Sequence, residues 1–171
     1  MLKEISFLLL FLLVFASASW AMDFSELYKS PELNLYAKKA KLLGDMVKES
    51  QISLKDASSS RLRILAMVDL MQDQRAYELA LENLSKAVVR VLKESTDLSS
   101  PRVQYKMDYA ARKVSFGLGL VEASRMAKLE TQHQENQMVT ITLYGVAMRS
   151  SREGIRNIEE GIEEYSSLLL P

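Results

Sequence analysis

Cysteine is absent from this chain of 171 residues, and histidine, tryptophan and proline are scarce, with one, one and three copies. The lack of cysteine excludes disulfides, thiolate metal ligands, lipid-modified cysteine and c-type haem attachment. The only histidine, His133, lies in a polar stretch and leaves little material for a Ser-His-Asp triad or a Glu/His metal site. We therefore expect a protein that is not an enzyme and that holds no cofactor or metal.

Neither sign of charge is in excess, because 22 basic residues face 22 acidic ones. This balance provides no basic patch of the kind that binds nucleic acid. No tract is polar and charged enough to predict disorder. A protein or small-molecule partner is therefore more consistent with the composition than a nucleic acid.

The N-terminal 21 residues differ from the rest of the chain. Lys3 precedes an apolar run over residues 5–18, and Ser19, Trp20 and Ala21 follow it. This layout predicts a secretory signal peptide over residues 1–21, cleaved after Ala21 or, alternatively, after Ala18. An uncleaved anchor is the competing interpretation, but the apolar run is shorter than the ~20 residues of a membrane span.

A cleaved signal peptide would determine both the length of the mature chain and the compartment in which it resides. Removing residues 1–21 from 171 would leave 150 residues, the usual size of one domain. A cysteine-free helical domain behind such a leader fits the bacterial periplasm. We expect an exported protein without an integral membrane anchor after cleavage.

Two Ser-Pro pairs mark predicted helix starts. Ser30-Pro31 and Ser100-Pro101 each place a capping serine before proline at the first helical position. Residues 22–30 would then form an N-terminal arm in front of a helical domain over residues 31–171.

Hydrophobic periodicity predicts four amphipathic helices. Over residues 31–50 the expected apolar face consists of Leu35, Tyr36, Leu42, Leu43, Met46 and Val47. Over residues 59–94 a heptad seam consists of Tyr77, Leu81, Leu84, Val88 and Val91. From residue 101 the seam consists of Val103, Met107, Ala110, Val114, Gly117, Val121 and Ser124. Over residues 137–169 it consists of Ile141, Tyr144, Met148, Ser151, Ile155, Ile158, Ile162, Tyr165 and Leu169.

The last two seams are separated by seven polar residues, 131–137. They are out of phase, which favours a helix–helix connection, although one continuous helix is the alternative because the segment contains neither glycine nor proline. Four segments joined by short connections predict an all-α fold, an elongated antiparallel up-down four-helix bundle with coiled-coil-like seams.

Small residues mark two further stripes. Ser115, Gly119 and Ala123 share one side of the third predicted helix, while Ala147, Gly154 and Gly161 recur every seven residues on the fourth. Such stripes allow close helix packing, or leave room for a ligand. In the second case the ligand-binding residues would be Met107, Tyr109, Gly117 and Gly119, in a pocket between the helices that begin at residues 31 and 101.

Glutamates occur in two adjacent pairs, residues 159–160 and 163–164. We expect them to form a solvated face beside Ile158 and Ile162, although a cation or a basic partner is an alternative. The sequence thus supports two functional hypotheses. The first is a module that binds another protein or itself, and the second is a small-ligand sensor or carrier.

Overall fold

The computed structural model describes residues 22–95 and 98–169, and the predicted signal peptide lies outside these residues. Within the described residues the chain is all-helical, without strands, which confirms the predicted class. A short turn η1 (Leu27–Lys29) is followed by α2 (Pro31–Asp56), α3 (Ser60–Ser95), α4 (Pro101–Thr131) and α5 (Gln137–Ser166).

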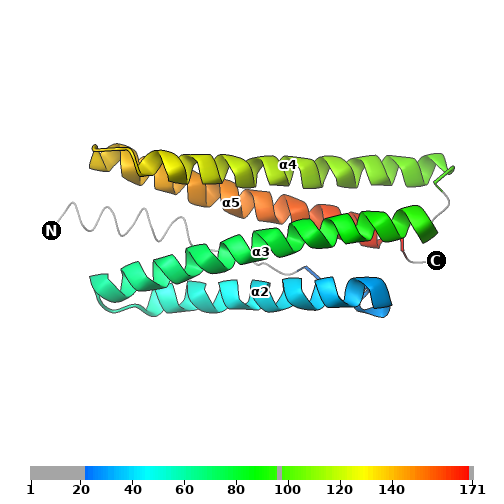
Figure 1. Ribbon diagram of the computed structural model, residues 1–171, viewed down its shortest axis with the longest axis horizontal. Helices are drawn as coiled ribbons and strands as arrows, with labels where there is room; N and C mark the ends of the chain where they lie inside the picture. Colours follow the sequence, from blue (N-terminus) through cyan, green and yellow to red (C-terminus); the bar gives the residue numbers. More distant parts are fainter. Residues whose placement is uncertain (1–21, 96–97, 170–171) are drawn as a thin grey trace.

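The four long helices pack as two pairs. α2 lies along α3 and α4 lies along α5, and the contact between α3 and α5 joins the two pairs (Figure 1). α2 and α4 lie at opposite edges of the elongated molecule (Figure 1). Each edge helix therefore turns one long side away from the other helices.

The heptad seams predicted for α3 and α4 are confirmed as the packed faces. On α3, Tyr77, Leu81, Leu84, Val88 and Val91 are all buried. On α4, Ala110, Val114, Gly117, Val121 and Ser124 are buried, while Val103 and Met107 are half-buried. On α5 the buried members are Met148, Ser151, Ile155, Ile158, Ile162 and Tyr165, and the side chain of Ile141 lies outside the description.

The face predicted for α2 is wrong for four of its six residues, whereas Val47 is buried and Leu43 is half-buried against the core as expected. The buried residues of this helix are Leu33, Ala37, Ala40, Gly44, Val47 and Leu54, whereas Leu35, Tyr36, Leu42 and Met46 are exposed. The reason is that the contact residues are small, because α2 packs on α3 largely through alanines and a glycine. A Cβ placed on Gly44 would lie 3.1 Å from the Tyr77 ring, so the small residue makes room for the large one.

The break between α4 and α5 is confirmed. α4 ends at Thr131 and α5 begins at Gln137. The Asn136 side chain caps α5 by accepting a hydrogen bond of 2.9 Å from the backbone N–H of Met138. The expected serine caps are correct in position only, because Ser30 and Ser100 occupy the N-cap positions without making a side-chain cap bond.

Glycines bring α4 and α5 into close contact. A Cβ on Gly117 would lie 2.5 Å from the carbonyl oxygen of Gly154, and one on Gly154 would lie 2.7 Å from the carbonyl oxygen of Gly117. A Cβ on Gly161 would lie 2.6 Å from the side chain of Val114. At the level of Gly117 and Gly154 the two backbones touch, and no larger residue fits.

The segment before α2 lies over the core. Met22, Phe24 and Leu27 are buried, and Tyr28 packs against the same core. The Asn34 side chain of α2 donates a hydrogen bond of 2.8 Å to the backbone oxygen of Tyr28. The backbone of Asp23 hydrogen-bonds the Glu163 carboxylate, which connects this segment to α5.

Candidate functional site

One exposed stripe runs along the side of α4 that faces away from α5. It consists of Tyr105, Asp108, Arg112, Ser115, Gly119, Glu122, Met126 and Leu129, which recur at alternating steps of three and four. All eight are exposed, and we call this series the outer seam. Since heptad spacing places residues along one stripe of a helix, the outer seam is a continuous strip that the described chain leaves uncovered.

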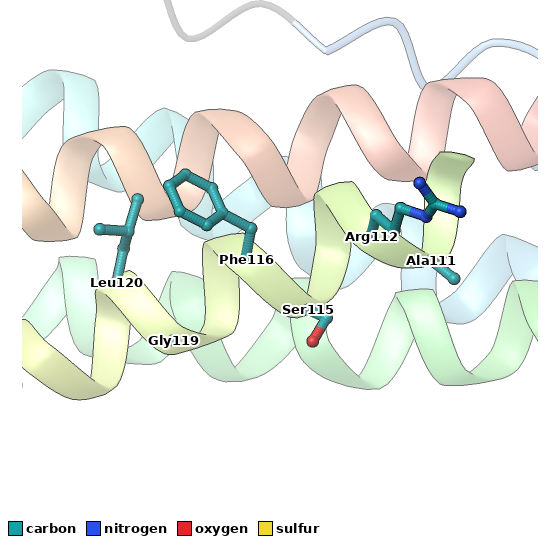
Figure 2. Close-up of a pocket in the computed structure, with 6 residues that line it drawn as sticks. All are labelled: Ala111, Arg112, Ser115, Phe116, Gly119 and Leu120. Atoms are coloured by element: carbon teal, nitrogen blue, oxygen red, sulfur yellow. The ribbon is translucent and has the colours of Figure 1, made fainter. Parts of the chain in front are cut away.

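The centre of the outer seam is hollow. Ala111, Arg112, Ser115, Phe116, Gly119 and Leu120, all from α4, line an open depression (Figure 2). Four of these residues, at positions 112, 115, 116 and 119, have the i, i+3, i+4, i+7 spacing of a hole in knobs-into-holes helix packing. The depression arises because Ser115 has a small side chain and Gly119 has none, beside the large ring of Phe116.

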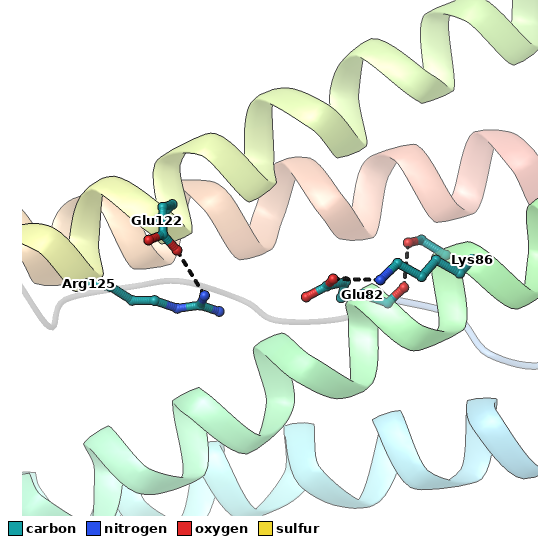
Figure 3. A network of polar contacts seen from close by, with 5 residues as sticks. Glu82, Lys86, Glu122 and Arg125 are labelled. Carbon is teal, nitrogen blue, oxygen red and sulfur yellow. Dashed lines mark hydrogen bonds and ion pairs between the residues drawn. The ribbon is translucent and has the colours of Figure 1, made fainter.

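Charged groups flank this hollow on both sides. Glu122 accepts a hydrogen bond of 2.9 Å from Arg125 one turn later on the same helix, and Figure 3 shows this pair together with Glu82 and Lys86 of α3. Among the described residues, no carboxylate lies within ion-pair distance of Arg112. The seam therefore presents an uncompensated guanidinium next to an apolar ring.

The four ligand-binding residues expected from the sequence all lie on α4 but point in different directions. Met107 packs half-buried against the core, whereas Tyr109 is partly exposed, with the Lys113 ammonium 5.7 Å from its ring centre. Gly117 is buried against α5, and Gly119 has no other heavy atom within 4 Å of the position its Cβ would take. Of the four residues, only Gly119 lines the hollow.

A polar contact that the sequence did not predict lies between α3 and α5. The hydroxyl of Tyr77 donates a hydrogen bond of 2.5 Å to Oε1 of Glu159, and both side chains are buried. The expected solvated position of Glu159 is thus wrong, because this glutamate lies on the side of α5 that faces α3. Burial raises the pKa of Glu159 to about 7, although the bond from Tyr77 opposes this shift.

A second hydrogen bond between a hydroxyl and a carboxyl group joins the same two helices, with the donor on α5 and the acceptor on α3. Ser151 of α5 donates a hydrogen bond of 2.6 Å to Oε1 of Glu78 on α3, and both groups are buried. Burial raises the pKa of Glu78. Burial also lowers the pKa of Lys128, whose ammonium interacts with Glu78. Such pairings cannot be derived from one helix at a time, since they depend on which helices become neighbours.

A smaller hollow of about 220 Å³ lies beside Tyr77. It is lined by Met22, Asp23, Phe24, Ser25 and Tyr28 from the N-terminal arm, by Lys41, Gly44, Asp45 and Lys48 from α2, and by Tyr77. Its polar groups are of both signs, because the Lys41 ammonium is bound to the Asp45 carboxylate at 2.5 Å. The hollow is large enough for a small polar molecule.

Other kinds of site find little support in the described part of the chain. There, no group of three or more His, Cys, Asp or Glu side chains is arranged to hold a metal ion. None of the described helices is long and apolar enough to cross a bilayer. The candidate sites are the outer seam of α4 and the hollow beside Tyr77. Comparisons with protein-family models, with curated proteins and with solved structures found no match for this chain.

Proposed function

We propose that the chain is an exported, non-enzymatic helical protein that binds another protein, or a second copy of itself, through the outer seam of α4. The observation that carries this proposal is the exposed stripe of α4, where Tyr105, Met126 and Leu129 lie uncovered on the side opposite the residues packed against α5. Exposed apolar residues along one side of a helix that is already packed on its other side favour contact with a further partner.

The residue types along this side of α4 support the same function. Tyr105, Phe116 and Met126 are 72%, 57% and 59% exposed. Aromatic residues, methionine and arginine are the types enriched at protein interfaces relative to other surfaces. Large apolar groups gathered on one exposed strip indicate an interaction site, whereas isolated ones do not.

Gly119 adds an energetic argument. Glycine in a helix interior costs about 1 kcal/mol relative to alanine. At Gly117 the cost is offset by the close contact with Gly154, but Gly119 makes no such contact. A partner that packs closely against the backbone at Gly119 would explain why a glycine occupies this position.

The location and overall arrangement are part of this proposal. The apolar run in residues 1–21 supports export through a cleaved signal peptide, and the bacterial periplasm is the proposed compartment. The four helices would form an antiparallel up-down bundle in that compartment. Intact mass of the exported protein tests both cleavage and its position, after Ala18 or after Ala21.

Photocrosslinking in the expressing cell tests the interaction. The variant Phe116→p-benzoylphenylalanine carries the reactive group in the hollow beside Ser115 and Gly119 of the outer seam, and Glu153→p-benzoylphenylalanine carries it on an exposed position of α5. We expect a covalent adduct of defined mass from position 116 and none from position 153. Equal adducts at both positions, or none at position 116, would contradict the proposal.

The hollow beside Tyr77 supports a second candidate, a small-ligand carrier or sensor. A ligand that binds only the folded state raises the melting temperature. A thermal-shift screen of small polar metabolites should then find a compound whose effect is lost in Lys41→Ala and kept in Lys55→Ala, since Lys55 is exposed elsewhere on α2. A panel that gives no shift counts against this candidate.

A further inference from the structure

We infer that the partner of the outer seam is a second copy of this chain, packed antiparallel along α4 with its two-fold axis near Phe116. This inference rests on the proposed function and makes it specific. It predicts a closed dimer whose contact consists of the same side of α4 from both chains, as a two-fold axis requires.

The charges along the exposed side of α4 determine the direction of packing. Arg102 and Arg112 lie towards its N-terminal end, whereas Glu122 and Glu130 lie towards its C-terminal end, and all four are exposed. An antiparallel copy places these two arginines against the two glutamates of the other chain, while Asp108 in the first half lies near Met126 of the other chain. A parallel copy would bring like charges together.

The same charges determine the register. In an antiparallel pair, Arg112 lies opposite Glu122 of the second copy, and Arg102 lies opposite Glu130. The first pair is centred on residue 117 and the second on residue 116, so one register satisfies both. Two pairs that agree within one residue are the charge complementarity that a two-fold dimer needs, and the first pair requires Glu122 to exchange Arg125 of its own chain for Arg112 of the other, or to bind both.

The hollow receives a side chain in this register. The Phe116 rings of the two copies meet near the two-fold axis, and each faces the depression beside Ser115 and Gly119 of the other copy. A knob that enters a hole of four residues is the basic unit of coiled-coil packing. Ser115 of one chain then lies opposite Gly119 of the other, where small residues let the helices approach closely.

A different self-contact is available on α2, where Leu35, Leu42 and Met46 are exposed. If α2 of one copy packed on α4 of another, each molecule would still have one of these two surfaces free. Further copies could then add at both ends, which gives an open chain of molecules. The α4 contact closes after two copies. The two arrangements therefore differ in the size of the assembly.

Charge reversal tests the register. The protein is purified in the form in which the expressing cell accumulates it, and its mass in solution is measured by sedimentation velocity over a dilution series. Arg112→Glu and Glu122→Arg should each raise the dimer dissociation constant about tenfold, because each reversal turns two attractions of the symmetric dimer into repulsions. The double variant should restore dimerisation, while Arg61→Glu on the exposed side of α3 serves as the matched control.

Cysteine crosslinking tests the geometry, since the natural chain contributes no cysteine. Ser115→Cys and Gly119→Cys are prepared separately, one with a size tag, and mixed under mild oxidation. We expect the mixed disulfide between the two variants to form faster than either homodimer. Preferential linkage of Gly119→Cys to itself indicates a parallel or shifted pair and overturns the inference.

The outcomes separate this inference from the proposed function. A monomer at all concentrations, or a series of ever larger species, overturns the α4 dimer. If Phe116→p-benzoylphenylalanine then captures a different protein, the interaction function holds and the partner assigned here is wrong. If position 116 captures nothing, both fail.

Discussion

The hydroxyl of Tyr77 donates a hydrogen bond of 2.5 Å to the carboxyl group of Glu159 across the contact between α3 and α5. Ser151 and Glu78 repeat the arrangement with donor and acceptor exchanged between the helices. Two buried carboxyl groups, one from each helix pair, thus connect the two halves of the molecule. The protonation of these groups links the stability of the fold to pH.

Glu159 should make the protein less stable as pH rises. Its pKa is about 7 in the folded protein against an ordinary value of 4.5, so between these values the folded state holds a proton that the unfolded state has lost. The stabilisation is complete below pH 4.5, decreases up to pH 7 and is lost above it, a total of about 3 kcal/mol. In Glu159→Gln, whose amide also accepts from Tyr77, this dependence should disappear.

Urea unfolding of the natural protein and of Glu159→Gln across pH 4–8 measures the effect. The two proteins should be similar in stability near pH 4, and the variant should be the more stable by about 3 kcal/mol at pH 8. Glu153→Gln, at an exposed position of α5, is the control and should leave the pH dependence unchanged. A parallel pH profile for natural protein and Glu159→Gln would exclude a raised pKa at Glu159.

Alanine at two neighbouring glycines of α4 should act in opposite directions. At Gly117 a Cβ would lie 2.5 Å from a backbone oxygen of α5, so Gly117→Ala must push the helices apart and should cost about 2 to 3 kcal/mol. At Gly119 the space is open, so Gly119→Ala should stabilise the monomer by about 0.5 to 1 kcal/mol. Chemical denaturation of both variants at low protein concentration gives the two values, and equal signs would contradict the placement of either glycine.

Removal of the hydroxyl at Ser151 should destabilise the α3–α5 contact. Ser151→Ala leaves the buried Glu78 carboxyl without its donor, at a cost of about 1 to 3 kcal/mol. Ser53→Ala, on the exposed side of α2, should change stability by less than about 0.5 kcal/mol. The inference about Glu78 fails if the two variants unfold at the same urea concentration.

The helix caps should differ in strength. The side chain of Asn136 accepts a hydrogen bond from the first turn of α5, so Asn136→Ala should cost about 1 kcal/mol. Ser30 occupies the same position before α2 without a side-chain cap bond, so Ser30→Ala should cost clearly less. Thermal unfolding of the two variants side by side measures the difference, and a larger loss at Ser30 would show that its hydroxyl does cap the helix.

Large side chains made most of the fold predictable from the sequence. The seams of α3, α4 and α5 are marked by leucine, isoleucine, valine or tyrosine at helical spacing, and they are packed as expected. On α2 the packed residues include Ala37, Ala40 and Gly44, which hydrophobic patterns weight weakly. The prediction therefore followed the larger side chains of Leu35 and Leu42, which face outward.

The candidate sites were less predictable, for a geometric reason. The sequence placed Ser115 and Gly119 on one stripe of α4. It could not show whether this stripe faces α5 or solvent, because that depends on how the two helices pack. The bond between Tyr77 and Glu159 joins residues 82 positions apart, and no local pattern in the sequence relates them. A glutamate beside another glutamate was interpreted as exposed, whereas the packing of α5 on α3 buries the first and leaves Glu160 to Lys113 and Arg156.

The backbone contact of Gly117 with Gly154 also has a mechanical consequence. At this level the two helices have no layer of side chains between them, so we expect α4 and α5 to move as one rigid unit. The two halves of the molecule, in contrast, meet through side chains that reach across the gap. We therefore expect bending of the molecule to occur between the two helix pairs, and a partner bound to the free side of α4 to act first on α5.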